Sequence, residues 1–435
     1  MTFPVIQGLA VRQVAPHLLH RCAERRLTVE EAIASNAVAQ EMESRDRAFL
    51  STLLLTVFRH RGEIDAILGQ LLDRPLPRKS GPARDILVLG VAQLLFLGLA
   101  PHAVIDLAVR AAKADRNALH FSGLINAVLR KVASGGTELL VGLDAPRLNT
   151  PDWLWVRWTK TYGEETARAI ATAHGERPGL DISFRTSARA WADRLGGELL
   201  PNAQLRLPAG HGSVPDLAGF ADGEWWIQDA AATFPARLLG DVVGKTVLDL
   251  CAAPGGKTLQ LASMGARVTA VDVSDMRLGR LRENLSRTGL SAAVVAGDAM
   301  SLALDGDWDV VMLDAPCSAT GTIRRHPELP WLKDEAVVKE LAGLQRRLLR
   351  KAATLVRPGG TLVYCTCSLE PEEGEMRVRG FLADTPGYEI IPAAGDWLPE
   401  GAVRPEGWLR TLPSMRYGSS QGMDGFFAVA MRRRG

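Results

Sequence analysis

The sequence predicts two fold classes in one chain: an all-α N-terminal domain, and an α/β domain with a doubly wound, mostly parallel sheet. Through residues 1–140, apolar residues recur at helical spacing, with little strand-like alternation. From residue 246 onward, short apolar runs alternate with amphipathic segments, as in strands joined by crossover helices. Between them, residues 163–240 mix helical and strand-like pieces. We therefore expect a helical domain at 1–140, a linker and small α/β subdomain at 141–235, and the main α/β domain at 236–435.

Length and composition bound the possibilities. The 435 residues suffice for two or three domains, and a hydrophobic content of 47% supports large cores and excludes general disorder. The net charge of +2 is too small to indicate nucleic acid by itself. Residues 1–140 hold 17 Lys and Arg against 13 Asp and Glu, an excess of +4, which hints at a basic N-terminal surface.

Cysteine and hydropathy patterns exclude several classes. The five cysteines are Cys22, Cys251, Cys317, Cys365 and Cys367. They are odd in number and lack C-x-x-C spacing, so we expect neither a disulfide framework nor a zinc site. The longest apolar run, 86–100, is interrupted by Gln93 and is shorter than the roughly 20 residues that span a bilayer. No signal peptide precedes it, and we expect a soluble, cytoplasmic protein.

The N-terminal residues indicate a binding module. Apolar residues recur at helical spacing in 48–58, 86–97 and 104–112, with a proline- and glycine-rich break at 75–82. His17 and His20 lie three residues apart, but no acid or cysteine cluster accompanies them, so we expect no metal there.

A linker is expected at 134–152, which is rich in glycine, proline and polar residues. Trp153, Trp155 and Trp158 follow closely. They could form a stacking platform for bases, but tryptophans beside aliphatic residues more often anchor a helix in a core, and we favour that interpretation.

The stretch VLDLCAAPGGKT, from Val247 to Thr258, organises the main domain. Residues 246–250 form a short apolar run typical of a buried parallel strand, and the small residues that follow let the backbone approach a ligand closely. A Walker phosphate loop would need a glycine where Cys251 stands, and G-x-G-x-x-G is also absent. The next strand carries Asp272 at its end, where an acid can accept hydrogen bonds from ribose hydroxyls. This pattern fits S-adenosylmethionine; a purely structural strand and turn is the alternative.

The remaining elements follow in order. We expect strands at 267–273, 292–296, 308–313, 360–365 and 425–431, and helices at 276–288 and 337–355. Polar candidates lie at or just past the strand ends: Asp272, Asp298, Asp314, Cys317 and Cys367. One edge of the sheet should therefore carry the site.

Two cysteine-bearing strand ends suggest a particular chemistry. Position 5 of cytosine is a poor nucleophile, so an enzyme first adds a thiolate at position 6, and the adduct then attacks a methyl group. The stretches LDAPCSATG and YCTCSL supply cysteines beside Asp314, an acid suited to the pyrimidine nitrogen. A packing role remains the default for any single cysteine.

These motifs carry a family resemblance. VLDLCAAPGGKT, LDAPCSATG, IRRHPE, YCTCSLEPEE and DGFF resemble the RNA 5-methylcytosine methyltransferase family, most closely its ribosomal RNA branch, RsmB (Sun/Fmu). DRAFLSTLLLTVFR and FSGLINAVLRKV resemble the NusB-like helical domain of this branch. The resemblance implies a Rossmann-like S-adenosylmethionine-dependent methyltransferase behind an RNA-binding NusB-like domain.

The resemblance also implies roles for residues. Cys367 would be the nucleophile, Cys317 would assist breakdown of the adduct, and Lys257 would orient the donor or the base. Donor contacts would come from Ala252, Ala253, Pro254, Gly255, Gly256, Lys257, Thr258, Asp272, Asp298 and Asp314. Arg324 and Arg325 would contact phosphates, with a solvated charged pair as the alternative.

The chain departs from the family pattern in places. Ala319 replaces the glycine usual in S-G-T-G, which affects loop geometry. SFRTS, residues 183–187, stands where R-x-N is more typical, which weakens any detailed RNA contact by the small subdomain. Cys365 lies two residues from Cys367 and is assigned a packing role, because the family motif selects the later cysteine.

The expected function is methylation of one cytosine in small-subunit (16S) ribosomal RNA, splayed into the pocket. RNA is the expected partner, with no membrane, no metal and a monomeric state. One alternative is a transfer RNA cytosine-5 methyltransferase. Another is a DNA cytosine methyltransferase, which would use Cys317 as nucleophile and lack the cysteine of T-C-S. A third is a non-catalytic RNA-binding or ribosome assembly factor.

Overall fold

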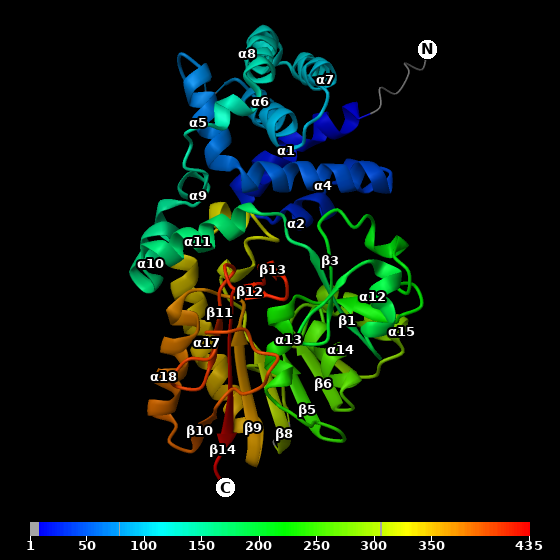
Figure 1. Cartoon of the computed structure of the whole chain (residues 1–435), viewed down its shortest axis with the longest axis vertical. Coiled ribbons are helices and arrows are strands. Elements are labelled where there is room, and N and C mark those ends of the chain that lie inside the picture. The colour runs from blue at the N-terminus through cyan, green and yellow to red at the C-terminus, as the bar shows by residue number, and fades with distance from the viewer. Residues whose placement is uncertain (1–7, 78, 305–306) are drawn as a thin grey trace. The chain divides into compact units, whose positions relative to one another are not determined.

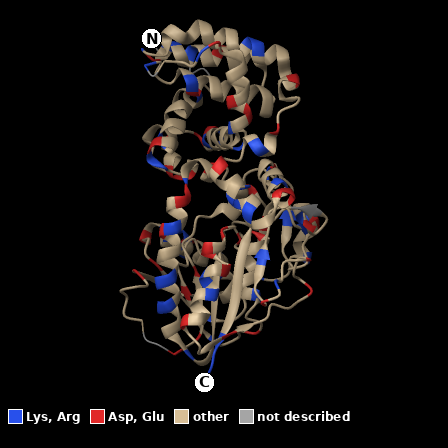
Figure 2. Ribbon diagram, turned by 90° about the vertical axis from the view of Figure 1, so that its left-hand side faces the viewer, with Lys and Arg blue, Asp and Glu red and all other residues tan. Residues whose placement is uncertain are grey.

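The computed structural model describes residues 8–77, 79–304 and 307–435. It divides the chain into two compact units. The helical unit comprises the residues up to 175 together with 326–334, and the sheet unit comprises 176–325 and 335–435. Both are drawn in Figure 1, and Figure 2 marks the Lys and Arg residues in blue and the Asp and Glu residues in red.

The helical unit is built from short helices around one apolar core. Its elements are α1 Leu9–Arg25, α2 Val29–Ala34, α3 Ala37–Gln40, α4 Ser44–Arg59, α5 Arg61–Leu71, α6 Ala83–Val91, the π-helical η1 Ala92–Phe96, α7 Pro101–Ala114, η2 Leu119–Phe121, α8 Ser122–Gly135, η3 Gly136–Leu140, α9 Ala145–Leu148, α10 Asp152–Tyr162, α11 Glu164–Gly175 and α16 Leu329–Leu332. Leu18, Leu50, Leu87 and Leu129 come from four of these helices and are fully buried in the core. The prediction of an all-α N-terminal domain is confirmed.

The expected linker, 134–152, contains helical turns and packs on the helical unit. The Asn149 side chain accepts the N–H groups of Gly62 and Glu63 at 3.0 and 3.2 Å and donates to the Glu63 carboxylate at 2.7 Å. These bonds tie the segment to α5. The packing interpretation is confirmed for Trp158, which is buried in α10.

One nine-residue segment from the second half of the chain packs in the helical unit. Within residues 326–334, the Trp331 indole donates to the Phe58 carbonyl oxygen at 3.1 Å. The Trp153 indole donates to the Pro330 carbonyl oxygen, also at 3.1 Å. The segment directly follows IRR, so the chain leaves the sheet unit and returns to it within a few residues.

A small antiparallel sheet opens the sheet unit. Its strands are β1 Leu180–Phe184, β2 Glu198–Leu199, β3 Leu205–Leu207 and β4 Trp225–Ile227, in the order β2-β3-β1-β4. Helices α12 Arg189–Leu195 and η4 Val214–Asp216 lie within the same stretch of chain. Ile182, Leu205 and Trp225 form its buried core, as expected for a small α/β subdomain.

The large sheet has the order β10-β14-β9-β8-β5-β6-β7, and β11 pairs with β14. Its strands are β5 Thr246–Leu250, β6 Arg267–Asp272, β7 Ala293–Ala296, β8 Trp308–Asp314, β9 Val356–Thr366, β10 Tyr388–Ile391, β11 Leu409–Thr411 and β14 Phe426–Arg433. Strands β5 to β9 pair in parallel, and β14 joins antiparallel. The predicted doubly wound, mostly parallel sheet is confirmed, and its strand order reverses between β5 and β8.

Helices cover both faces of this sheet (Figure 1). They are α13 Ala230–Arg237, α14 Gly256–Ser263, α15 Asp275–Thr288, α17 Glu335–Leu355 and α18 Glu375–Asp384. The short turns η5 Thr320–Thr322 and η6 Pro371–Glu373 lie in the loops after β8 and β9, and a two-stranded ribbon pairs β12 Arg416–Tyr417 with β13 Ser420–Gln421. Successive side chains along a strand point to opposite faces of the sheet, so each strand packs against helices on both faces. Leu248 and Val311 pack with α17, whereas Val247 and Val310 pack with α13 and α14. Among the described residues, no helix is long and apolar enough to cross a membrane.

Candidate active site

The turn after β5 is shaped by glycine. Gly255 precedes α14 with φ +107°, and a Cβ there would lie 2.3 Å from Leu281 Cδ1. Only glycine therefore fits this position of the turn, and its lack of a side chain lets the backbone run close to the sheet edge. Thr258, in the first turn of α14, donates its hydroxyl to Asp249 Oδ2 at 2.6 Å. Residues 252–258 thus form a backbone cradle at the carboxyl end of β5.

The next two strand ends are joined to this turn. Asp272, the last residue of β6, accepts the N–H of Ala253 at 3.1 Å and that of Ser274 at 2.8 Å. The Asp272 carbonyl accepts the N–H of Gly297, after β7, and Asp298 accepts the N–H of Met300 at 2.9 Å. The structure therefore brings the predicted acids 272 and 298 to one edge, next to the glycine turn.

Asp249 is a functional candidate that the sequence reasoning missed. It is fully buried in β5, and Oδ1 has no hydrogen-bond partner within the described part of the chain. Burial raises the pKa of Asp249 to about 7. A buried, unpartnered acceptor beside the cradle fits a ligand that carries N–H or O–H donors, as an amino acid or ribose group does. A single acid inside an apolar strand was the available signal.

Lys257, in α14, forms an ion pair with Asp314, the last residue of β8. The ammonium lies 2.7 Å from Asp314 Oδ2 and 5.0 Å from the centre of the Phe426 ring. Burial opposes the charge, but Asp314 raises the pKa of Lys257 above its ordinary value, so the side chain stays protonated. The Cys365 thiol lies 3.5 Å from Asp314 Oδ1, and burial raises the pKa of Cys365 well above its ordinary value. A buried, protonated thiol suits the predicted packing role.

Cys317 and Cys367 face each other. Their sulfur atoms lie 3.5 Å apart, although the residues are 50 positions apart in the chain. Cys317 follows β8 and Cys367 follows β9, and the parallel register that pairs Asp314 with Cys365 brings the two strand ends together. Both side chains are partly accessible. The edge thus combines two cysteines and a lysine–aspartate pair.

Buried acids hold the loop that carries Cys317. Glu373 accepts the N–H of Ser318 at 2.9 Å and a side-chain N–H of Gln345 at 3.0 Å. Thr320 donates its hydroxyl to Glu370 at 3.2 Å. Burial raises the pKa of Glu373. The sequence reasoning assigned no role to these acids, although both follow T-C-S directly in the stretch LEPEE.

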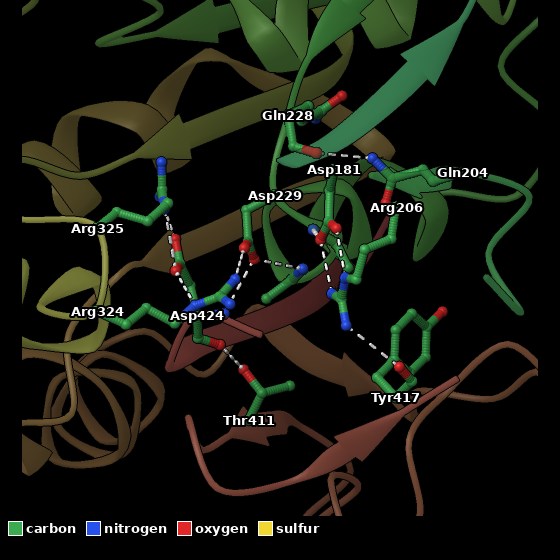
Figure 3. Close-up of polar contacts among 12 residues, drawn as sticks. Asp181, Gln204, Arg206, Gln228, Asp229, Arg324, Arg325, Thr411, Tyr417 and Asp424 are labelled. Atoms are coloured by element: carbon green, nitrogen blue, oxygen red, sulfur yellow. Dashed lines mark hydrogen bonds and ion pairs between the residues drawn. The ribbon is translucent and has the colours of Figure 1, made fainter. Parts of the chain in front are cut away.

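The paired arginines of IRR both bind the carboxylate of Asp424 (Figure 3). Arg324 is buried; its Nε donates to Asp424 at 2.9 Å, and its guanidinium also pairs with Asp229. Arg325 donates to both carboxylate oxygens of Asp424, and its side chain is 36% exposed. Phosphate contact by either arginine remains a prediction. The geometry favours Arg325, because Arg324 is enclosed between two carboxylates.

Ala319 explains one departure from the family pattern. It has φ 58° and ψ 25°, the left-handed conformation that favours glycine. The family glycine therefore matches the backbone here, and alanine adopts the same turn.

Among the described residues, no group of His, Cys, Asp or Glu could hold a metal ion.

A mostly parallel sheet with a reversal beside a glycine turn, and acids at the next strand ends, defines a Rossmann-like S-adenosylmethionine-dependent methyltransferase. Family models agree: residues 236–432 match 16S rRNA methyltransferase RsmB/F, and residues 9–134 match the NusB family. Ribosomal RNA small subunit methyltransferase B of Escherichia coli (strain K12) is 36% identical over 370 residues, and the match covers 81% of this chain and 85% of that protein. The protein of the same name from Cronobacter sakazakii is 33% identical over 448 residues, 98% and 100% of the two chains. This chain belongs to the ribosomal RNA small subunit methyltransferase B family.

Among solved structures, a methyltransferase homologue from Pyrococcus horikoshii is 28% identical with a TM-score of 0.55, over 64% of this chain and 93% of that one. Its similarity agrees with the methyltransferase fold of the sheet unit.

Proposed function

We propose that this protein transfers a methyl group from S-adenosylmethionine to carbon 5 of one cytosine in small-subunit (16S) ribosomal RNA. Family membership supports the reaction and the RNA class. The observation that carries the chemistry is the 3.5 Å approach of the Cys317 and Cys367 sulfurs on the edge that also holds the glycine turn. The proposed setting is a cytoplasmic monomer with RNA as its partner.

The residues at the end of β5 and β6 fit the donor. Residues 252–258 would face it with backbone groups, and Asp272 would accept from the ribose hydroxyls. Asp298 and Asp314 are further contact candidates, and Asp249 offers its unpartnered oxygen to the amino group. When bound, the donor supplies an electrophilic methyl group on a sulfonium.

Cys367 acts as the nucleophile in this proposal. Its thiolate forms a bond to ring carbon 6, and the displaced ring electron pair takes the methyl group at carbon 5. Asp314 faces the pyrimidine nitrogen and Lys257 holds Asp314 in place through their 2.7 Å ion pair. The Cys317 thiolate then takes the proton from carbon 5. The freed electron pair restores the ring double bond, and the bond between Cys367 and carbon 6 breaks.

The alternatives make different predictions for the same variants. A DNA cytosine methyltransferase would depend on Cys317 as nucleophile and methylate duplex DNA. A transfer RNA enzyme would methylate transfer RNA in preference to 16S RNA. A non-catalytic assembly factor would bind RNA without consuming the donor.

The test is methyl transfer from labelled donor to 16S RNA, transfer RNA and DNA. Cys367→Ala should abolish incorporation into 16S RNA, whereas Cys365→Ala, the matched control two residues away, should keep at least a substantial part of it. Normal turnover by Cys367→Ala would remove the nucleophile assignment. Bisulfite sequencing of ribosomal RNA from cells without the protein should show one cytosine that is no longer protected from bisulfite conversion. A conversion pattern unchanged from that of cells with the protein would contradict the ribosomal substrate.

A further inference from the structure

The DGF segment, Asp424 to Phe426, contacts three parts of the site at once. It was singled out in the sequence but has no role in the chemistry described so far. Asp424 binds Arg324 and Arg325, at the far end of the loop that begins with Cys317. We name residues 317–325 the Cys317 loop.

The carboxylate of Asp424 is the hub of a buried charge cluster (Figure 3). Its Oδ1 lies 2.9 Å from Arg324 Nε and 3.1 Å from Arg325 Nε. Burial opposes its charge, but Arg325 and Arg324 hold the pKa of Asp424 below its usual range, so it remains ionised. Asp229, at the N-terminus of α13, pairs with Arg324 and accepts the Asp424 N–H at 3.0 Å. Removing one such charge leaves its buried partners uncompensated.

The backbone of the DGF segment also forms a hydrogen bond with the middle of the Cys317 loop. The Gly425 N–H donates to the Gly321 carbonyl at 2.8 Å, and the Gly321 N–H donates to the Cys367 carbonyl at 3.0 Å. A Cβ on Gly321 would lie 1.9 Å from the Gly425 oxygen, so the two backbones are in direct contact. One residue of the Cys317 loop, Gly321, is therefore bonded both to the nucleophile segment and to the DGF segment.

The third residue of the DGF segment, Phe426, contacts Lys257. The Phe426 ring lies under the Lys257 ammonium, 5.0 Å from ring centre to Nζ. Phe426 is buried, and it begins β14, which is paired with β9 along six residues. The DGF segment is thus fixed to the sheet and can transmit that rigidity to the loop.

We propose that Asp424 and Gly425 are positioning residues for adduct release: they hold the Cys317 loop so that Cys317 reaches the proton on carbon 5. The inference rests on the proposed function. Cys367 lies directly after β9, whereas Cys317 lies on the loop that Asp424 anchors. Loss of the Asp424 charge should therefore slow release more than attack. Small displacements of a reacting group can cost on the order of 10- to 100-fold in rate.

The experiment separates the two steps. At saturating RNA and labelled donor, a single turnover gives the rate of methyl transfer, and a denaturing gel gives the fraction of protein still bonded to RNA. Asp424→Asn should transfer its first methyl within a few-fold of the wild-type rate and then accumulate bonded RNA, with release slowed at least roughly tenfold. A fall in both steps without bonded RNA would mean a merely structural role and would overturn the inference.

Asp181→Asn is the matched control. Asp181 belongs to the same buried cluster, but its carboxylate binds Arg206 at 2.6 and 2.8 Å and the Ala230 N–H at 3.0 Å. This change should reduce stability without accumulation of bonded RNA. Where Asp424→Asn does not fold, Asp229→Asn takes its place, because it removes one of the two carboxylates that hold Arg324 while Asp424 still neutralises that guanidinium.

Cys317→Ala distinguishes failure of the inference from failure of the proposed function. If Cys317→Ala leaves no bonded RNA, the proposed release chemistry is wrong. If Cys317→Ala accumulates bonded RNA and neither Asp424→Asn nor Asp229→Asn does, only the positioning role is wrong.

Discussion

Replacing Asp249 by asparagine should change how the stability of the protein depends on pH. Burial raises the pKa of Asp249 from an ordinary 3.8 to about 7, so the folded state binds its proton more tightly than the unfolded chain does. The stabilisation from this proton is complete below about pH 4 and is lost as the pH rises through about 7. The loss amounts to roughly 4 kcal/mol, at about 1.4 kcal/mol for each unit of pKa.

Asp249→Asn has no such proton to lose, and its side-chain oxygen can still accept the Thr258 hydroxyl. Relative to the wild type, the variant should gain stability between pH 5 and pH 8, by a melting-temperature difference on the order of 10 °C. Asp309→Asn is a control of opposite sign, because hydrogen bonds from Thr246 lower the pKa of Asp309. That variant should lose stability relative to the wild type as the pH rises from about 3 to about 5.

Thermal unfolding of the three full-length proteins across this pH range provides the measurement. Equilibrium binding of the donor gives a second readout, since Asp249→Asn should weaken it if Oδ1 accepts from the amino group. Parallel melting profiles for wild type and Asp249→Asn would refute the reasoning.

Substitutions at Gly321 and Ala319, both in the Cys317 loop, give further predictions. Gly321→Ala should destabilise the folded protein by roughly 2 kcal/mol or more and slow turnover, because its Cβ would meet the Gly425 oxygen. The control Gly343→Ala lies on the open face of α17 and should be neutral or stabilising. Equal urea midpoints for the two variants would contradict this prediction. Ala319→Gly should stabilise by roughly 0.5 to 1 kcal/mol, since relief of the left-handed strain exceeds the added chain entropy; a lower urea midpoint would count against it.

Local patterns were sufficient to predict six of the eight strands of the main sheet, whereas β10 and β11 were not predicted. Residues 246–250 were predicted as a strand and form β5 with the same bounds, because an apolar run ends where small residues begin. The glycine turn and both cysteines were also accessible from motif and spacing. Periodicity likewise indicated α4, α6 and α7 of the helical unit.

Features that depend on distant partners were not predictable from the sequence. Arg324 was expected to contact phosphate or solvent, but its partners Asp229 and Asp424 are 95 and 100 residues away in the chain. Residues 326–334 sit inside the α/β half of the sequence, yet their indole and carbonyl contacts are with the helical unit. No local pattern specifies such pairings, because they arise only when the chain folds.

Mass spectrometry of the complex between Cys317→Ala and its RNA tests the central chemistry most directly. After incubation with donor and digestion, the peptide that contains Cys367 should carry a methylated cytidine nucleotide bonded through its sulfur. Recovery of that peptide unmodified, or a nucleotide on any other residue, would contradict the assignment of Cys367 as the sulfur that bonds the base.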